Sequence, residues 1–272
     1  MTTDDGLQLH LQHWPASEPA RGQVLLVHGL GEHIGRYAHI AAKLNAAGWD
    51  VHGWDHRGHG RSEGKRGDIP DHDALLRDTA RVIDTVRKPG ARFVLLGHSM
   101  GGAIAARFAA EALAPQPATW SRPLDALVLS SPALDAGLSG GQKLALSLAE
   151  RLAPGLAVSN GLKPDWISRD PAVVKAYASD PLVHDRITAR LTRFIVDAGT
   201  TAIAAAPRWT LPTLLMWAGA DRCVAPRGSE AFAAAAPKNV VMSKPWPGFS
   251  HEIFNEPEKA EVLAALTAWL NG

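Results

Sequence analysis

The stretch FVLLGHSMGGAIAARF, residues 93–108, decides the fold of this 272-residue chain. Phe93 to Leu96 form a short apolar run of the kind found in strands that are buried on both faces. The residues after Gly101 carry apolar side chains at helical spacing. Between them, Gly97-His98-Ser99-Met100-Gly101 predicts a tight turn that lifts a serine hydroxyl above the end of a sheet. The stretch therefore predicts a strand, a nucleophile turn and a helix.

The same alternation of short apolar runs and helical patterns extends along the chain in both directions. Apolar runs predict further strands at residues 24–27, 49–54, 126–129, 214–217 and 240–242. Helical spacing predicts helices at residues 37–47, 74–87, 104–113 and 257–270. Strands that alternate with helices form a parallel sheet covered by helices. We therefore expect an α/β fold.

One long segment, residues 133–209, interrupts this alternation. It contains no convincing strand, whereas Leu144, Leu148 and Leu152 recur every four residues. A helical segment of this length is longer than a simple crossover requires. We expect a core formed by residues 1–132 and 210–272, with residues 133–209 inserted in it as a helical cap, or lid.

Composition and charge exclude several classes of protein. The chain has 46% hydrophobic and 20% charged residues, and Lys plus Arg (28) nearly balance Asp plus Glu (27), so no basic field exists for nucleic acid. The single cysteine, Cys223, excludes an internal disulfide and a multi-cysteine metal site. No run approaches the roughly 18 apolar residues of a membrane-spanning helix, and the N-terminus lacks the pattern of a signal peptide. We expect a cytoplasmic protein that can also lie at a membrane surface.

The pattern G-x-S-x-G occurs three times, at residues 60–64, 97–101 and 137–141. Only Ser99 has an apolar strand before it and a helix directly after it. Ser62 lies in a polar stretch, and Ser139 follows a proline-containing turn. Helix capping is the other common role for a serine at such a position. We expect Ser99 to be the nucleophile.

A serine hydroxyl needs an adjacent base, and in this arrangement an acid and then a histidine follow the serine along the chain. Of the two later histidines, His184 lies in the expected cap, whereas His251 follows the last expected strand. Asp221 comes directly after the strand at 214–217 and is the expected acid. Two alternative acids do not end a strand: Glu230 and Glu252.

The oxyanion of an acyl-transfer intermediate needs two backbone N–H groups that point at one position. One N–H group is expected from Met100, which follows the nucleophile. The other is expected from Leu30, in the loop HGLGE at residues 28–32. Gly29 in this loop would let the backbone approach a substrate closely.

These motifs together resemble the monoacylglycerol lipase branch of the α/β-hydrolases, which also contains lysophospholipases. The segments that carry the resemblance are HGLGEHIGRY (28–37), DHRGHGRSEG (55–64), GHSMGG (97–102), SDPLV (179–183), GADR (219–222) and GFSHE (248–252). The resemblance implies an eight-stranded, mostly parallel sheet and a mobile cap that forms an acyl-chain tunnel. It implies no cofactor. It also implies a triad and an oxyanion hole at the positions derived above: Ser99, Asp221 and His251, with Leu30 and Met100.

We therefore expect a serine hydrolase that cleaves fatty-acid esters, with monoacylglycerols as the leading substrate, through an acyl-enzyme on Ser99. The alternatives are a general carboxylesterase, a lysophospholipase, a thioesterase or an aminopeptidase. A non-catalytic binder that retains the fold is an alternative of another class. The sequence does not indicate the oligomeric state.

The apolar residues of the expected cap either pack it onto the core or contact an acyl chain. We take three of them, together with Gly29, as candidate substrate-binding residues: Leu144, Leu148 and Trp166. Through the cap the protein could contact a membrane surface transiently. A row of arginines at helical spacing suits a solvated face better than an anionic-lipid site: Arg186, Arg190 and Arg193.

A metal site is not expected. His52, His56 and His59 have a suitable spacing, but the glycines between and around them argue against the helix that would align them. Loop hydrogen bonding is the simpler role for these histidines. Cys223 is either a small loop residue or a thiol through which reagents could disturb the site.

Overall fold

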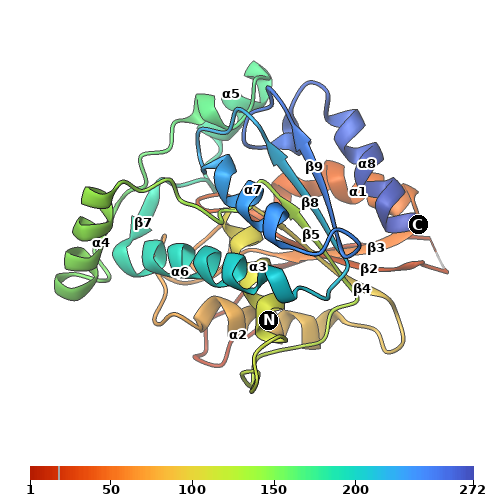
Figure 1. Cartoon of the computed structure of the whole chain (residues 1–272), viewed down its shortest axis with the longest axis horizontal. Coiled ribbons are helices and arrows are strands. Elements are labelled where there is room, and N and C mark those ends of the chain that lie inside the picture. Colours follow the sequence, from red (N-terminus) through yellow and green to blue (C-terminus); the bar gives the residue numbers. More distant parts are fainter. Residues whose placement is uncertain (18) are drawn as a thin grey trace.

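A computed structural model describes residues 1–17 and 19–272. It is built around a seven-stranded sheet, and Figure 1 shows how the helices are arranged about this sheet. The strand order across the sheet is β1-β3-β2-β4-β5-β8-β9. The strands are β1 (Leu11–Trp14), β2 (Gly22–Val27), β3 (Trp49–Trp54), β4 (Phe93–His98), β5 (Ala126–Ser130), β8 (Thr213–Ala218) and β9 (Val241–Trp246). Strand β1 runs antiparallel to β3, and every other pair of neighbours is parallel.

The expectation of eight strands in this sheet was wrong, because seven are present in the described part of the chain. The first residues do not form a further strand. The Thr3 N–H donates to the Leu7 carbonyl, and the Gly6 N–H donates back to Thr3. Residues 1–8 therefore close a tight turn, and a single bridge between Thr2 and Gln8 is all the pairing that they make.

Helices cover both faces of the sheet (Figure 1). The strands bury side chains toward each face. In β2, Val24 and Leu26 pack in one apolar core, and Leu25 and Val27 pack in the other. Residues of α1 (Ala38–Ala46) and α8 (Lys259–Asn271) line the first core. The second core is lined by residues of α2 (Ala74–Val86), α3 (Met100–Glu111), α6 (Ala189–Ala205) and α7 (Pro226–Ala235).

Parallel pairing brings the carboxyl ends of the central strands to one edge of the sheet. Val27, at the end of β2, lies opposite Gly97 near the end of β4. His98 in turn lies opposite Ser130 at the end of β5. The loops that follow these strands therefore meet at one edge, where open α/β sheets commonly bind ligands.

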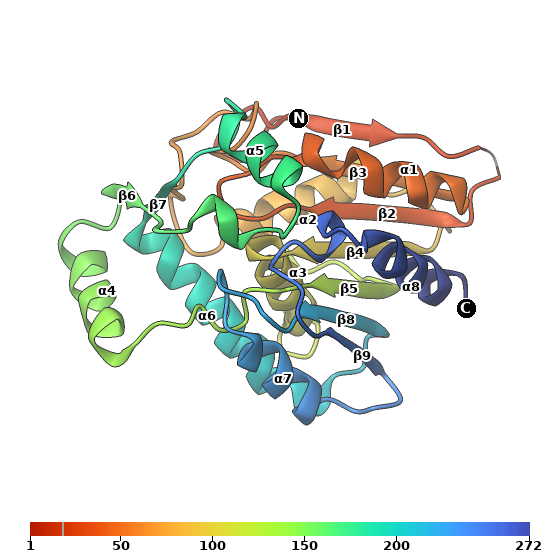
Figure 2. The ribbon, with the colours of Figure 1, turned by 90° about the horizontal axis from the view of Figure 1, so that it is seen from above.

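The segment between β5 and β8 contains α4 (Gly140–Leu152), β6 (Ala157–Ser159), α5 (Pro171–Ser179), β7 (Arg186–Thr188) and α6. The expectation that it contains no strand was wrong, since β6 and β7 pair antiparallel in a small separate sheet. Each has only three residues, too few to show a period in the sequence. Figure 2 shows α4, β6 and β7 beyond the end of the main sheet.

Two helices of this segment differ in their environment. Helix α6 packs against α3 and buries Leu191, Phe194 and Ile195. Each such apolar side chain contributes roughly 1.5–3 kcal/mol to folding. Helix α4 buries Leu146 alone. Over the described residues, no helix combines the length and hydropathy required to cross a bilayer.

Candidate active site

Ser99 occupies a strained turn between β4 and α3. Its backbone has φ +55° and ψ −121°, a conformation that residues with a side chain rarely adopt. The Ser99 N–H donates to the Ser130 carbonyl at 3.0 Å, and the Ser99 carbonyl accepts from Ala103 and Ala133. Although Ser99 precedes the helix, its hydroxyl makes no capping hydrogen bond. These hydrogen bonds fix the backbone on both sides of Ser99, and its hydroxyl is not used to cap the helix.

The glycines of the same turn are required by close packing. A Cβ atom at Gly97 would overlap the Gly101 carbonyl, and one at Gly101 would overlap the Val27 carbonyl. A Cβ at Gly102 would lie 2.7 Å from the Cβ of Pro132. The strand and the helix therefore pass each other at a distance that only glycine permits.

His251 and Asp221 form a buried pair. Nδ1 of His251 lies 2.7 Å from Oδ2 of Asp221, and Oδ1 of Asp221 accepts the N–H groups of Cys223 at 2.8 Å and Val224 at 3.1 Å. The ring of His251 lies 4.8 Å from the ring of His98, the residue before Ser99. Because Asp221 occupies Nδ1, Nε2 is the ring nitrogen that remains for proton exchange.

The charges around this pair shift both of its pKa values. Burial lowers the pKa of His251, but Asp221, Glu252 and Glu32 outweigh it, so the pKa lies above the ordinary 6.5. Burial raises the pKa of Asp221, but His251 and the N–H groups of Val224 and Cys223 outweigh it, so this pKa lies below 3.8. These pKa shifts keep Asp221 as a carboxylate and make the His251 imidazole accept a proton more readily.

Ser99, Leu30 and Met100 line one cleft of about 180 Å³. Leu30 lies in the loop after β2, and Met100 is the first residue of α3. A Cβ on the neighbouring Gly29 would lie 3.1 Å from the Cβ of Ser99, so the loop backbone passes close to this serine. The positive end of the α3 dipole also points toward this position, which favours a developing anion.

The rest of the cleft is mostly apolar and comes largely from the segment between β5 and β8. Its other lining residues are Ala133, Ala136, Leu138, Ser159, Asn160, Leu162, Ile187, Thr192, Ile195, Cys223 and Val224. A second cavity, of about 340 Å³, shares Ala136 and Leu138 with it and continues past Val196 and Ile203. The arrangement can hold an apolar chain beside a serine hydroxyl.

Comparison with known families matches residues 18–258 to the family described as serine aminopeptidase, S33. The chain belongs to this family of α/β-hydrolases. The monoacylglycerol lipase of Mycolicibacterium smegmatis is 37% identical over 270 residues, which cover 97% of this chain and 93% of the relative. The monoglyceride lipase of Rattus norvegicus is 32% identical over 98% of this chain and 88% of its own length.

Solved structures agree with this α/β-hydrolase fold. The monoacylglycerol lipase of Paleococcus ferrophilus superimposes with a TM-score of 0.85 and 36% identity, covering 97% of this chain and 98% of that one. A monoglyceride lipase from Saccharomyces cerevisiae also reaches 0.85 at 22% identity, over 98% and 92% of the two chains, and shares the fold. The family and these relatives support carboxylic ester hydrolysis by this α/β-hydrolase.

Three residues expected to bind substrate lie elsewhere. The cleft lining does not include Leu144, Leu148 or Trp166. Leu144 and Leu148 are on α4 with 65% and 54% of their surface exposed. Trp166 is half-buried, and the cationic groups of Lys163 and Arg222 lie 5.7 and 4.9 Å from the centre of its ring.

The competing candidates from the sequence have other partners. The Ser62 hydroxyl donates to the Asp55 carbonyl and accepts from the His10 N–H, and Ser139 caps α4 through Gln142. His184 lies in the segment between β5 and β8, with its ring 4.7 Å from that of His59. Glu252 pairs with Arg36, and Glu230 lies exposed on α7. The arginine row is also paired, with these acids in order: Asp185, Asp68 and Glu150.

The three histidines whose spacing suits a metal site, His52, His56 and His59, are separated in this α/β-hydrolase. His56 and His59 pack around His28, whereas His52 stacks on His13 beside Asp50. The rings of His13 and His52 are parallel within 1° and 4.1 Å apart, so their in-plane lone pairs cannot both point at one ion. Lys88 already pairs with Asp50 at 3.2 Å. Ligand geometry therefore does not favour a metal at this cluster.

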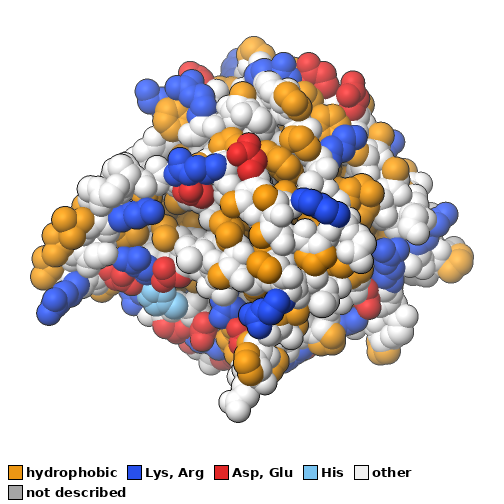
Figure 3. Space-filling view, viewed as in Figure 1, with side chains coloured by type: hydrophobic (Ala, Val, Ile, Leu, Met, Phe, Trp, Pro, Cys, Tyr) orange, Lys and Arg blue, Asp and Glu red, His pale blue; other side chains and the backbone are white. Residues whose placement is uncertain are grey.

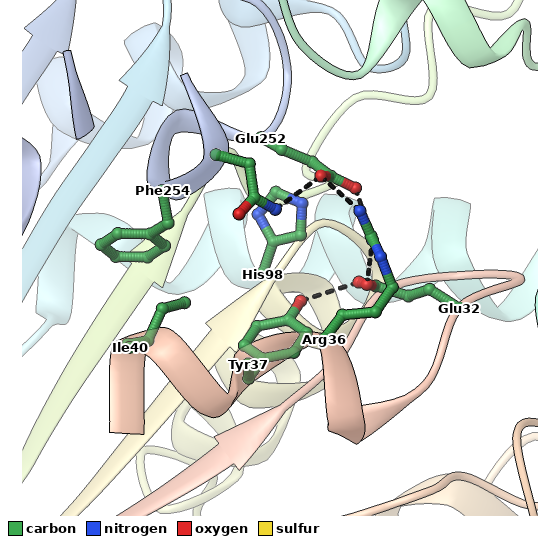
Figure 4. A pocket seen from close by; sticks show the side chains of 8 residues that line it. Glu32, Arg36, Tyr37, Ile40, His98, Glu252 and Phe254 are labelled. Atoms are coloured by element: carbon green, nitrogen blue, oxygen red, sulfur yellow. Dashed lines mark hydrogen bonds and ion pairs between the residues drawn. The ribbon is translucent and has the colours of Figure 1, made fainter. Parts of the chain in front are cut away.

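Sequence reasoning missed a buried charged cluster beside the site, formed by Glu32, Arg36 and Glu252 (Figure 4). Arg36 lies 2.5 Å from Glu32 and donates to both carboxylate oxygens of Glu252 at 2.7 Å. Tyr37 donates its hydroxyl to Glu32 at 2.7 Å. All three charged residues belong to motifs that carried the resemblance, and charges within glycine-rich loops were the available signal.

Proposed function

We propose that this chain is a serine hydrolase that cleaves fatty-acid esters of glycerol, with monoacylglycerols as its leading substrates. The observation that carries the proposal is Ser99, held in a strained turn in the wall of an apolar cleft, while the ring of the preceding His98 lies 4.8 Å from the His251 ring of the Asp221–His251 pair. The lipase names of the relatives at 37% and 32% identity support the substrate class.

In this mechanism Ser99 attacks the ester carbonyl as Nε2 of His251 takes the hydroxyl proton. Asp221 holds Nδ1 and stabilises the imidazolium that forms. The tetrahedral oxyanion accepts the backbone N–H groups of Leu30 and Met100. His251 then protonates the departing alcohol, which leaves an acyl group on Ser99. Water attacks this acyl-enzyme by the same route, releasing the fatty acid and restoring the serine.

The acyl chain would extend from Ser99 along the apolar lining toward Ala136 and Leu138. These two residues also border the second cavity, which leaves room for a long chain. Ser159 and Asn160 give the cleft a polar region that suits a hydroxylated leaving group. Shape and polarity thus support a long acyl group joined to a small polar alcohol.

Residues 133–209 would act as a cap on the core formed by residues 1–132 and 210–272. Much of the cleft lining comes from the proposed cap, which supports this division. Helix α6 packs against α3 as part of the second core, so movement of the cap would be restricted to α4 and the segments that flank it.

The cap would also contact lipid surfaces through an outer apolar face of α4. Leu144, Leu148 and Leu152 are 65%, 54% and 80% exposed at four-residue intervals. Figure 3 shows hydrophobic side chains at the outer end of the molecule, where Figure 1 places α4. Such a face suits the surface of a bilayer or micelle that presents the substrate. The cytoplasmic location expected from the sequence stays a prediction.

Replacement of Ser99 tests the proposed chemistry. The Ser99→Ala variant should lose at least roughly a thousandfold in kcat on monoacylglycerol and on p-nitrophenyl octanoate. It should also lose labelling by a fluorophosphonate and keep the Tm of the unmodified protein. Substantial ester hydrolysis by a folded Ser99→Ala protein would exclude this nucleophile.

A second candidate function follows from the description of the matching family as serine aminopeptidase. A profile of glycerol monoesters from acetyl to palmitoyl, run beside aminoacyl-anilides, separates the two candidates. We expect kcat/KM to rise with acyl length and the anilides to be poor substrates. A flat profile, or preferred cleavage of the anilides, would overturn the lipid assignment.

A further inference from the structure

The charged cluster of Glu32, Arg36 and Glu252 is buried although charges favour water. Glu32 and Glu252 are 3% and 5% exposed, and the Arg36 side chain is 11% exposed. Replacing a buried ion pair with apolar residues is often neutral or stabilising. A gain in stability therefore explains the burial of these charges poorly. The residues in contact with the cluster suggest a functional explanation.

Glu32 holds the loop that carries Leu30. Its Oε1 accepts the Gly29 N–H at 2.7 Å, which ties the ends of the turn at residues 29–32 together. A Cβ on Gly29 would meet this Oε1 at 2.8 Å on one side and the Cβ of Ser99 at 3.1 Å on the other. The Gly29 backbone is thus enclosed between a fixed carboxylate and Ser99. Because Glu32 occupies the Gly29 N–H, the next N–H, that of Leu30, is the one left for a substrate.

Glu252 holds the loop that carries His251, which directly precedes it. Its two carboxylate oxygens bind the two terminal nitrogens of Arg36, and its N–H donates to the Ile167 carbonyl at 2.8 Å. Asn255 adds a hydrogen bond at 2.7 Å. Arg36 therefore joins the loop after β2 to the loop after β9, as Figure 4 shows.

The cluster also places negative charge behind the imidazole. Two carboxylates face one guanidinium, and burial together with His251 lowers the pKa of the intervening His98 to about 4, so His98 adds no charge. The groups that face His251 are Asp221 and the Cys223 thiol from the loop after β8, His98 from β4, Glu32 from the loop after β2 and Glu252 from its own loop. This excess of negative charge favours the imidazolium that forms during catalysis.

We propose that Glu32, Arg36 and Glu252 are positioning residues, which hold the loop that carries Leu30 and the loop that carries His251 in a fixed arrangement relative to each other. Glu32 orients the peptide that presents the Leu30 N–H, Glu252 fixes and electrostatically biases His251, and Arg36 couples the two. The inference rests on the proposed function, because it assigns these residues to the chemistry of Ser99 and His251.

A matched control is available a few residues further along the chain. Glu256 is fully buried and pairs with Arg169, and its carboxylate also accepts the Arg169 N–H at 2.7 Å. The hydrogen bonds of its carboxylate thus go to the cap segment rather than to the loop after β2. Glu256→Gln therefore measures what the loss of a buried glutamate charge does to the fold alone.

The experiment compares Glu32→Gln, Glu252→Gln and Glu256→Gln by Tm and by kcat and KM on p-nitrophenyl butyrate between pH 5 and 9. We expect the first two variants to lose about tenfold to a hundredfold in kcat, part of the 10²–10³ that removing an oxyanion donor costs, with little change in KM. In Glu252→Gln, the acid limb of the pH profile, where kcat/KM falls as His251 is protonated, should move to lower pH. Glu256→Gln should match their loss of Tm and keep kcat.

Coupling between the two loops is tested by the double variant and by Arg36→Lys. The Glu32→Gln/Glu252→Gln protein should lose less than the product of the single losses, because the two residues act through Arg36. Arg36→Lys keeps the charge and should retain more activity than Arg36→Ala. If kcat and the acid limb follow Tm in all of the glutamine variants, Glu256→Gln included, the cluster is structural and the proposal is overturned.

Variants that do not fold still leave the proposal testable through Glu252→Asp, which keeps the charge but shortens the reach to Arg36. It should fold and show a reduced kcat with the acid limb close to that of the unmodified protein. Unchanged kcat in folded Glu252→Asp would overturn the positioning role. Retained activity in Ser99→Ala would instead overturn the proposed function, so the two failures can be told apart.

Discussion

Position 99 shows how backbone conformation selects between identical motifs. Three serines share the pattern G-x-S-x-G, yet only Ser99 combines a positive φ with glycines that are pressed against neighbouring backbone. Ser139 has an extended backbone and caps α4, and nothing lies within 4 Å of a Cβ built on Gly140 or Gly141. The motif indicates a nucleophile only where a strand and the following helix pack closely against each other.

An alanine substitution should therefore be damaging in the motif around Ser99 and nearly neutral in the motif around Ser139. Gly101→Ala would drive a Cβ into the Val27 carbonyl and should cost about 2–3 kcal/mol of unfolding free energy together with most of the activity. Gly140→Ala, in the other motif, should leave activity intact and change stability by less than about 1 kcal/mol. Urea unfolding and ester hydrolysis measure both quantities. A fully active, equally stable Gly101→Ala protein would contradict the crowding.

Helix α4 illustrates how an element can be amphipathic and still not belong to the core. Its leucines at four-residue intervals resemble a buried stripe in the sequence, and they were expected either to pack the cap or to bind substrate. In the structure Leu146 is the buried residue of the helix, and the stripe of Leu144, Leu148 and Leu152 is exposed. A periodic pattern identifies one face of a helix but not the partner of that face.

Polar substitutions on this face should separate lipid binding from chemistry. Leu144→Ser/Leu148→Ser should reduce sedimentation with phosphatidylcholine vesicles and lower the rate on vesicle-borne monoacylglycerol about fivefold or more. The rate on soluble p-nitrophenyl butyrate should stay the same, because neither residue lines the cleft. Leu146→Ser, on the buried face, serves as the control and should lower Tm instead. Equal loss on both substrates in the double variant would argue against a lipid-contacting face.

Across the whole molecule, four buried histidines are kept neutral. Burial, with neighbouring imidazoles as the next cause, holds the pKa values of His28, His56 and His59 well below 6.5. The pKa of His98 is lowered to about 4, by burial and by His251. Between these folded values and the unfolded value of 6.5, the unfolded chain binds protons that the folded chain does not. Stability is therefore present above pH 6.5 and is lost as the pH falls below it.

Tm should consequently fall between pH 7.5 and 5.5, before most carboxylates are protonated. Each buried neutral histidine contributes about 1 kcal/mol to the loss between pH 6.5 and 5.5. His251 has a raised pKa and opposes this loss by a smaller amount, because the unfolded imidazole is itself mostly protonated over the same interval. Calorimetry at several pH values measures the trend, and His56→Asn should flatten it. A Tm that is constant over this range would show that these histidines are not neutral when buried.

The sequence alone determined the parts of this α/β-hydrolase that depend on local pattern. Apolar runs located β4 and the five other strands that make up the parallel part of the main sheet. The turn at Ser99 was predicted from the residues on either side of it. The Asp221–His251 pairing was also anticipated, because parallel strands deliver the residues that follow them to one edge. Strand count and the three-residue strands β6 and β7 could not be read, since short segments carry almost no periodicity.

Tertiary structure alone decided the matters that depend on which distant surfaces meet. These matters include the exposed face of α4 and the cleft lined by the segment between β5 and β8. They also include the bridge from Glu32 through Arg36 to Glu252, which joins residues 220 positions apart. A buried charge can be placed only where its partner has already been brought near, and one-dimensional spacing does not encode that proximity. Local propensity thus specified the elements and the nucleophile turn, while packing specified the environment in which that turn can act.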